Sequence, residues 1–390
     1  MPGLIVNPRS RIFHGHDWVY ASEIKKVFGD PQPGDVISLK DFKDRPLGSA
    51  IYNPNSQIVA RRFSRRSQKL DLDFFRRRLG RALDYRRGLA LDPADYCRIV
   101  WSESDGLPGV IVDRYGDYLA LQTNTLAMDT RRDLITEALV DLIKPTGIVE
   151  RNESPVRVPE GLPPRAGMLH GPEPSPWHVD FDGISLTIDL IGGQKTGVYL
   201  DQWGHYAVAG AHAAGCRVLD CFSNQGGFAL ACAAAGAASV TALETSTEAL
   251  EAGRANAGRC GLDVDFIEAN VFDYLKEAER ASERYGLIIL DPPPFARSKK
   301  NRRDALRGYK EINLRALKLL EPGGVLLTFS CSYHVSAPDL LEVVASASVD
   351  AKRNVRRLRN LSQRLDHPVI ATIPESEYLQ GFVFQTLAAW

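Results

Sequence analysis

The sequence predicts an α/β protein whose C-terminal part, residues 186–390, folds around a doubly wound and mostly parallel sheet. Three observations predict this class. From residue 217 onward, short apolar runs alternate with stretches of helical periodicity. The run Arg217–Phe222 leads into a glycine-bearing turn and an Ala-rich helix, and several such runs end in polar or reactive side chains. Residues 1–70 and 71–185 predict two smaller domains, a β-barrel and a central α+β domain.

Composition limits the classes of protein that fit. The chain has 390 residues, of which 44% are apolar and 25% charged, enough for two or three domains with ample core. Basic and acidic residues number 48 each, so affinity for nucleic acid must come from local patches rather than net charge. The six cysteines form no C-x-x-C pair and no zinc-finger spacing, so we expect no metal. Without a signal-peptide pattern or a membrane-length apolar run, the sequence predicts a cytoplasmic protein.

The N-terminal region alternates short strand-like runs with turn residues. The sequence of residues 33–63, PGDVISLKDFKDRPLGSAIYNPNSQIVARRF, resembles a PUA domain, a small RNA-binding barrel. The alternative is a small barrel that serves only for packing. The strands that we expect are Asp17–Tyr20, Asp35–Leu39, Leu47–Tyr52 and Gln57–Arg61.

A basic helix follows the barrel. Apolar residues at helical spacing predict an amphipathic helix over Asp71–Leu89 with a basic face. That face is either solvated or in contact with a phosphate backbone, and the RNA-binding barrel beside it favours the second interpretation. The basic residues of this region are Arg61, Arg62, Arg65, Arg66, Lys69, Arg76, Arg77, Arg78, Arg81, Arg86 and Arg87.

The central domain is predicted as strands around one helix, Asp129–Ile143, which Lys144 and Pro145 end. Residues 152–178 contain seven prolines and predict an extended loop, with β structure following at Trp177–Leu190. The strands expected here are Arg98–Trp101, Gly109–Asp113, Tyr118–Gln122 and Ile148–Arg151.

The turn after the first strand of the C-terminal domain predicts a nucleotide site. Gly226 and Gly227 let the backbone approach a ligand, and Glu244, at the end of the next strand, can accept both ribose hydroxyls. The G-x-G-x-x-G spacing of dinucleotide enzymes is absent. Asp220 would repel a pyrophosphate but suits an ammonium or sulfonium group. The turn therefore predicts S-adenosylmethionine rather than NAD as the ligand.

The rest of the domain repeats strand and helix. Asp220, Glu244, Asn270, Asp291 and Cys331 all lie at expected strand ends, where a parallel sheet gathers its ligands. The expected strands are Val240–Leu243, Asp263–Glu268, Leu287–Leu290 and Val325–Phe329, the helices Val271–Arg280, Arg303–Leu320 and Pro338–Ala347, and the final antiparallel pair Val369–Ile373 with Phe382–Thr386.

Four motifs, GGQKTGVYLDQ, LDCFSNQGGF, LDPPPF and FSCSYH, follow the PUA-like barrel in this order. As a set they resemble the RlmI-like family of 23S ribosomal RNA 5-methylcytosine methyltransferases. The resemblance implies a Rossmann-like class I methyltransferase domain, S-adenosylmethionine as donor, and 23S rRNA or a large-subunit precursor as partner, with a homodimer left open. The residues expected to bind the donor are Lys195, Tyr199, Gln202, Asp220, Phe222, Ser223, Asn224, Gly226, Gly227, Glu244, Asn270, Val271 and Asp291.

Such chemistry needs a reactive thiol, because carbon 5 of cytosine becomes nucleophilic only after a thiolate adds to carbon 6. Cys331 is the candidate. Cys221 is the rival, but it follows Asp220 within a strand, so its side chain should point to the opposite face. Asp291 is the second catalytic candidate, because an acid at ring nitrogen 3 can supply a hydrogen bond or proton. His334 and Ser332 are candidates for the general base.

Two further basic stretches and two other functions remain open. One stretch comprises Arg297, Lys299, Lys300, Arg302, Arg303 and Arg307, and we expect it to bind phosphates beside the target base. The other, Lys352–Arg364, reads as solvated surface. The alternative functions are methylation of another base, such as guanine at nitrogen, without a covalent intermediate, and a non-catalytic RNA-binding or ribosome-assembly factor.

Overall fold

A computed structural model describes residues 1–91, 94–193, 198–296 and 301–387 of the chain. The chain divides into two compact units. The first unit comprises Met1–Trp177, Ile188–Leu200 and Leu365–Ser376, and the second comprises the intervening segments and the C-terminus. Within the described ranges, every helix is too short or too polar to span a bilayer.

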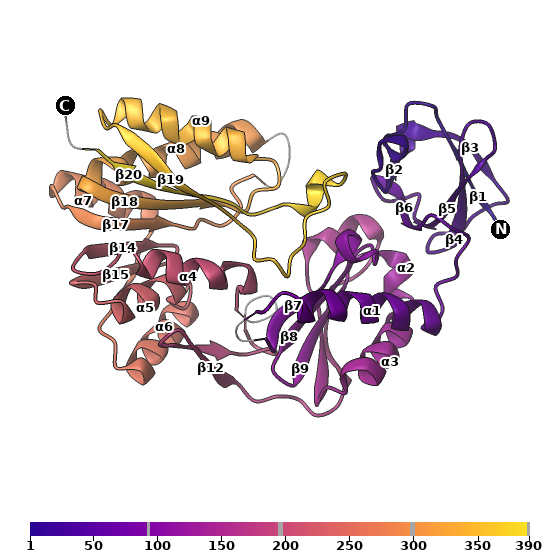
Figure 1. The fold of residues 1–390 in the computed structure, drawn as a ribbon, viewed down its shortest axis with the longest axis horizontal. Helices are drawn as coiled ribbons and strands as arrows, with labels where there is room; N and C mark the ends of the chain where they lie inside the picture. The colour runs from indigo at the N-terminus through magenta and orange to yellow at the C-terminus, as the bar shows by residue number, and fades with distance from the viewer. Residues whose placement is uncertain (92–93, 194–197, 297–300, 388–390) are drawn as a thin grey trace. The chain divides into compact units, whose positions relative to one another are not determined.

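The first unit begins with a six-stranded sheet in the order β2-β6-β5-β4-β1-β3, drawn in indigo in Figure 1. All four predicted strands are confirmed, whereas β1 and β3 were missed. Strand β3 was missed because its central residues, Lys25, Lys26 and Val27, are exposed and give no alternation of apolar and polar positions. The strands are β1 Gly3–Val6, β2 Trp18–Tyr20, β3 Ile24–Phe28, β4 Val36–Lys40, β5 Pro46–Tyr52 and β6 Ile58–Ser64.

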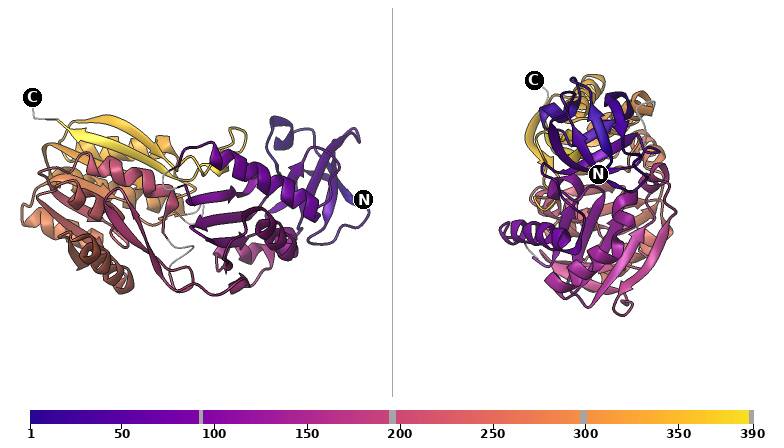
Figure 2. Two further views of the ribbon diagram at one scale, coloured as in Figure 1. Left: turned by 60° about the horizontal axis from the view of Figure 1, so that its bottom comes forward. Right: turned by 90° about the vertical axis from the view of Figure 1, so that its right-hand side faces the viewer.

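A five-stranded sheet, in the order β11-β10-β9-β8-β7, forms the rest of the first unit with helices α1 and α3 (Figure 2). The amphipathic helix is confirmed: α1 buries Phe74, Phe75 and Leu79 against the sheet, and Asp71 caps it by accepting the Phe74 N–H at 2.9 Å. The bounds are α1 Leu72–Arg87, β7 Tyr96–Trp101, β8 Val110–Tyr115, β9 Tyr118–Thr123, α2 Leu126–Asp129, α3 Arg132–Ile143, β10 Gly147–Asn152 and β11 Arg165–His170.

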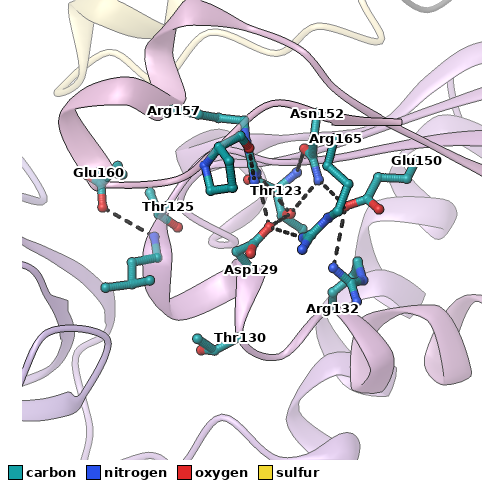
Figure 3. A network of polar contacts seen from close by, with 12 residues as sticks. Thr123, Thr125, Asp129, Thr130, Arg132, Glu150, Asn152, Arg157, Glu160 and Arg165 are labelled. Atoms are coloured by element: carbon teal, nitrogen blue, oxygen red, sulfur yellow. Dashed lines mark hydrogen bonds and ion pairs between the residues drawn. The ribbon is translucent and has the colours of Figure 1, made fainter. Parts of the chain in front are cut away.

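The expected loop over residues 152–178 is wrong in part, because it contains a 3-10 helix, Pro155–Glu160, and strand β11. A network of polar contacts fixes both (Figure 3). Asp129 accepts hydrogen bonds from Arg157 at 3.0 Å and Arg165 at 2.8 Å, and Arg165 also donates to Glu150 at 2.8 Å. Arg157 is only 1% exposed. The charged residues that suggested a solvated loop therefore form hydrogen bonds within the fold.

The second unit holds a seven-stranded sheet in the order β16-β15-β14-β17-β18-β20-β19, with strands β14 to β18 mutually parallel. The predicted alternation of strand and helix is confirmed. The bounds are β12 Trp177–Phe181, β13 Ile184–Ile188, α4 Trp203–Gly210, β14 Arg217–Cys221, α5 Gly227–Ala234, β15 Ser239–Glu244, α6 Thr247–Cys260, β16 Asp265–Glu268, α7 Val271–Arg280, β17 Tyr285–Leu290, α8 Arg302–Leu319, β18 Leu320–Ser330, α9 Ala337–Asp350, β19 Val355–Ser362 and β20 Gln380–Thr386.

The predicted partner of the last strand is wrong. Strand β20 pairs antiparallel with β19, whereas Ile370 forms only an isolated bridge with Ile373. Much of the stretch read as solvated surface is therefore an edge strand. Its arginines, Arg356, Arg357 and Arg359, are exposed. Charged side chains on an edge strand discourage pairing with other chains.

Helices cover both faces of this sheet (Figure 1). Helices α7, α8 and α9 pack on one face around a cluster that includes Leu275, Tyr309 and Leu340, all fully buried. Helices α4, α5 and α6 lie on the other face. This arrangement leaves the carboxyl ends of β14, β15, β17 and β18 as the edge at which a ligand can bind.

Candidate active site

The strand register brings the predicted site residues to neighbouring positions. Cys221 pairs with Leu290, and Leu290 pairs with Thr328. Asp291 therefore follows β17, and Cys331 follows β18 just beyond Ser330. These two strands are adjacent in the sheet, so the two residues leave it side by side.

Backbone geometry explains the turn after β14. Gly226 has φ 86° and caps α5, a conformation that L side chains rarely adopt. A Cβ on Gly227 would lie 2.5 Å from the Tyr206 ring. In this structure, the group that closely approaches the Gly227 backbone is therefore the Tyr206 ring. Phe222 and Asn224 also have positive φ, of 65° and 49°.

Asp220 is a buried carboxylate that lacks a full set of partners. Its side chain is fully buried, and Oδ2 accepts the Ala229 N–H at 3.0 Å. Oδ1 has no hydrogen-bond partner among the described residues. Burial, with the nearby carboxylates Asp291 and Glu244, raises the pKa of the Asp220 carboxyl to about 8. A positively charged ligand group would satisfy Oδ1 and favour the ionised form.

Glu244 organises the backbone around the same turn. Its Oε2 accepts the Asn224 N–H at 3.0 Å, and its Oε1 accepts the N–H groups of Thr245 and Ser246 at 2.7 and 3.1 Å. Oε1 also accepts the Thr245 hydroxyl at 3.2 Å, so Oε2, which has one donor here, is the oxygen at which a ribose hydroxyl can still bind the half-buried Glu244. Ser223, 5% exposed, keeps a hydroxyl without a partner in the described part of the chain.

Asn270 is exposed and caps helix α7. Its Oδ1 accepts the N–H groups of Phe272 at 2.9 Å and Asp273 at 3.4 Å. The oxygen predicted to meet adenine therefore already has a role in the fold. Val271, which follows it, is 2% exposed and presents an apolar surface at the helix start.

A chain of hydrogen bonds orients Asp291. His205 Nδ1 lies 2.6 Å from Gln202 Oε1, and Gln202 Nε2 donates to Asp291 Oδ2 at 3.0 Å. Burial lowers the pKa of His205 to about 4, so its imidazole is neutral at pH 7. Because Gln202 Oε1 can only accept a hydrogen bond, Nδ1 is the ring nitrogen that donates to it. The sequence predicted Gln202 as a donor contact but missed His205. The only signal was its position three residues on, one helical turn away.

Hydrogen bonds anchor the residues on both sides of Cys331. Cys331 itself is half-buried, and its Sγ donates to the Pro292 carbonyl at 3.5 Å. The buried Tyr309 hydroxyl lies 3.0 Å from Ser330 Oγ and 2.9 Å from Ser332 Oγ, so both residues that flank the cysteine are anchored. Tyr309 was missed, because nothing in its own stretch of sequence connects it with Cys331.

The structure also separates Cys331 from the alternatives. Cys221 is fully buried in the core, and burial together with Asp220 raises its pKa well above the ordinary value. It is thus a poor source of thiolate. Ser332 is 1% exposed, and its hydroxyl accepts the Ala296 N–H at 3.3 Å, which favours a structural role. His334 is half-buried and packs edge-on against Tyr333.

Some predicted residues lie elsewhere. Lys195 lies outside the described residues, as do Arg297, Lys299 and Lys300 of the basic stretch. Tyr199 is half-buried and belongs to the first unit.

The turn, the unpartnered Asp220 oxygen and the half-exposed Glu244 fit a ligand with a cationic end and a ribose. With the parallel sheet, they define an S-adenosylmethionine-dependent methyltransferase. A family model of that description matches residues 162–373, which confirms the predicted cofactor and fold class. A PUA-like domain model matches residues 7–65, in agreement with the N-terminal resemblance.

The chain belongs to the ribosomal RNA large subunit methyltransferase I family. It is 38% identical to the protein of that name from Klebsiella pneumoniae over 95% of this chain and 94% of that one. It is 40% identical to the Shewanella denitrificans protein over 94% of each chain. A putative S-adenosylmethionine-dependent methyltransferase from Streptococcus mutans has the same fold, with TM-score 0.84, 22% identity and coverage of 99% and 100%.

Proposed function

We propose that this protein methylates carbon 5 of a cytidine in 23S ribosomal RNA through a covalent bond between Cys331 and carbon 6. The observation that carries the proposal is the half-buried Cys331 thiol just after β18, beside the strand that Asp291 follows. The relatives of this chain are named large-subunit rRNA methyltransferases, which supports the substrate class.

The reaction begins when the Cys331 thiolate adds to carbon 6 and turns carbon 5 into an enamine-like nucleophile. S-adenosylmethionine, when bound, supplies the methyl group that carbon 5 accepts. A base then removes the proton from carbon 5, the double bond between carbons 5 and 6 re-forms, and the sulfur leaves carbon 6 as thiolate. The target base must be unstacked to reach this edge, so the substrate cytidine is single-stranded or flipped.

Asp291 acts on the base while the thiolate adds. Electrons move from carbon 6 towards ring nitrogen 3, and an acid at that nitrogen stabilises the developing charge by a hydrogen bond or proton. Gln202 holds Asp291 Oδ2, and the neutral imidazole of His205 holds the Gln202 amide in the required orientation. These two residues position Asp291.

The donor is held by the turn and by the strand-end acids. Asp220 Oδ1 accepts a hydrogen bond from the ammonium of the methionine moiety, and Glu244 Oε2 accepts one from a ribose hydroxyl. Phe222, Ser223 and Asn224 complete the turn wall, and Val271 packs on the adenine. The resemblance also assigns Lys195 and Tyr199 to donor binding.

The test is Cys331→Ala, assayed on 23S rRNA transcribed in vitro, with bisulfite sequencing to locate the product. We expect Cys331→Ala to keep its affinity for the donor but to form less than about 1% of the wild-type product. Without the thiolate adduct at carbon 6, carbon 5 is not nucleophilic enough to accept the methyl group. Cys216→Ala, a half-buried thiol at the start of β14, is the matched control and should remain active.

A second readout separates the mechanisms. RNA with 5-fluorocytidine at the target cannot release the fluorine, so the wild type should form a protein–RNA adduct that survives denaturation, and Cys331→Ala should not. Full activity of Cys331→Ala would instead point to methylation of another base without a covalent intermediate. Failure of the wild type to bind S-adenosylmethionine would leave a non-catalytic RNA-binding factor.

A further inference from the structure

A cationic groove of about 1000 Å³ lies within the first unit. Its walls come from the end of β6, one face of α1, the turn at residues 103–106 and the segment at residues 368–373. We call it the arginine groove, because it is lined by Arg62, Arg65, Arg66, Arg77, Arg78 and Arg81.

Helix periodicity creates one wall of the groove. The residues of α1 that line it recur at intervals of three or four, which places them on a single face. Arg77, Arg78 and Arg81 thus form a row about one turn long, and Tyr85 extends it by a further turn. Tyr85 is 42% exposed at that end.

The acids of the groove are already neutralised. Asp17, Glu103 and Asp105 line it, and each carboxylate is paired with an arginine. The pairs are Asp17 with Arg62 at 2.7 Å, Glu103 with Arg61 at 2.6 Å and Asp105 with Arg86 at 2.5 Å.

Four of the arginines have no such partner. Within the ranges that the structure describes, no carboxylate lies within ion-pair distance of Arg65, Arg66, Arg78 or Arg81. Arg78 is held in place, since its guanidinium lies 5.5 Å from the Phe74 ring centroid and donates to the Phe63 carbonyl at 2.8 Å. Burial and the neighbouring cations Arg81 and Arg77 lower the pKa of Arg78. An anion bound in the groove would reduce the electrostatic repulsion between these guanidinium groups.

In the other basic stretch, two of the described arginines are already paired. Arg302 pairs with Asp339 at 2.6 Å, and Arg307 pairs with Asp304 at 2.6 Å. Two arginines of that stretch are therefore neutralised locally, whereas four arginines of the groove are not, as far as the described residues extend.

We propose that the arginine groove binds the sugar–phosphate backbone of the rRNA substrate, outside the strand-end site that holds the target cytidine. This inference rests on the proposed function, since it takes the substrate to be rRNA. A polyanion fits because guanidinium groups arranged along a helix can each meet a different phosphate. A net-neutral chain also needs such a patch to bind nucleic acid.

The test uses the full-length triple variant Arg65→Gln, Arg66→Gln, Arg81→Gln, because these three side chains are exposed and their loss should spare the fold. Affinity for 23S rRNA is measured by fluorescence anisotropy between 50 and 300 mM NaCl. Each lost phosphate contact removes about 0.7 to 0.9 from the slope of log K against log salt. We expect the slope to fall by about 2 to 3 and affinity at 100 mM to fall roughly 100-fold.

The matched control removes three exposed charges of the same unit that do not line the groove: Arg9→Gln, Lys25→Gln, Lys26→Gln. It should keep its affinity and salt slope. The groove variant should keep its donor affinity, and its kcat at saturating RNA should match that of the wild type.

If the two triple variants lost equal affinity for 23S rRNA, the proposal would be overturned, since net charge alone would then explain binding. An unchanged salt slope in the groove variant, with the wild type still methylating 23S rRNA, would overturn the groove and leave the proposed function intact. A wild type that neither binds nor methylates 23S rRNA would overturn both.

Discussion

Donor binding should expel a proton from Asp220. At pH 7 the buried Asp220 carboxyl of the free protein holds a proton, because its pKa is raised to about 8. A ligand ammonium beside Oδ1 favours the ionised carboxylate, so binding must release that proton. The perturbation that tests this is Asp220→Asn, which keeps the shape and removes the titration.

The magnitude follows from the pKa. With a pKa of about 8, about nine in ten free molecules carry the proton at pH 7. Binding should therefore release about 0.9 proton at pH 7, and affinity should rise nearly tenfold between pH 6 and pH 7. The ligand's own amino group, with a pKa of about 7.7 to 8.0, remains mostly protonated in this range.

Isothermal titration calorimetry in buffers of different ionisation enthalpy counts the released protons. Asp220→Asn should bind more weakly and release none. Glu244→Gln is the matched control: it weakens ribose contacts and removes only the smallest of the influences that raise the Asp220 pKa, so most of the proton release should remain. A wild-type count near zero, with affinity flat from pH 6 to pH 7, would refute the reasoning.

Three further substitutions test other contacts. Gly227→Ala should lower Tm by several degrees despite the better helix propensity of alanine, because its Cβ would meet the Tyr206 ring at 2.5 Å; an unchanged Tm in a thermal melt would contradict this. Tyr309→Phe should reduce kcat at least tenfold, because Ser330 and Ser332 lose their hydrogen bonds to the Tyr309 hydroxyl, and donor affinity should not change. Steady-state kinetics measure kcat, calorimetry measures donor affinity, and an unchanged kcat would contradict the prediction. Gln202→Ala should lower kcat and change its pH profile; a raised donor Kd with normal kcat would show that it contacts the donor instead.

The parallel strands and their ends could be predicted from the sequence. The central strand β17 is a short apolar run that stops at a polar residue, Asp291, and α7 was predicted with its observed bounds, Val271–Arg280. Such elements carry their own signal, because both faces of a central strand are buried and a helix shows its period.

Edge strands and long-range contacts could not be predicted from the sequence. Strands β3, β11 and β19 each have exposed positions with charged or small residues, so they lack an apolar pattern. The contact of Tyr309 with Ser332 joins residues far apart in the sequence and depends on tertiary packing. His205 and Gln202 lie one helical turn apart, and their spacing was the only local signal of that contact. Gly227 was predicted from ligand access, whereas the structure shows a packing constraint that no local pattern reveals.

The two units are interleaved along the chain, which crosses between them after residues 177, 187, 200, 364 and 376. The segment Leu365–Ser376 joins β19 to β20 of the second unit's sheet but is bound into the first, where Arg86 donates to the Asp366 carbonyl at 2.8 Å and Trp101 to the Ser376 carbonyl at 3.0 Å. Synthesis proceeds from the N-terminus, so this wall of the arginine groove emerges only after the parallel strands have been made. A nascent or truncated chain that ends before residue 365 lacks part of the groove. Completion of the arginine groove, the proposed RNA-binding surface, is thereby tied to near-completion of the parallel sheet during translation.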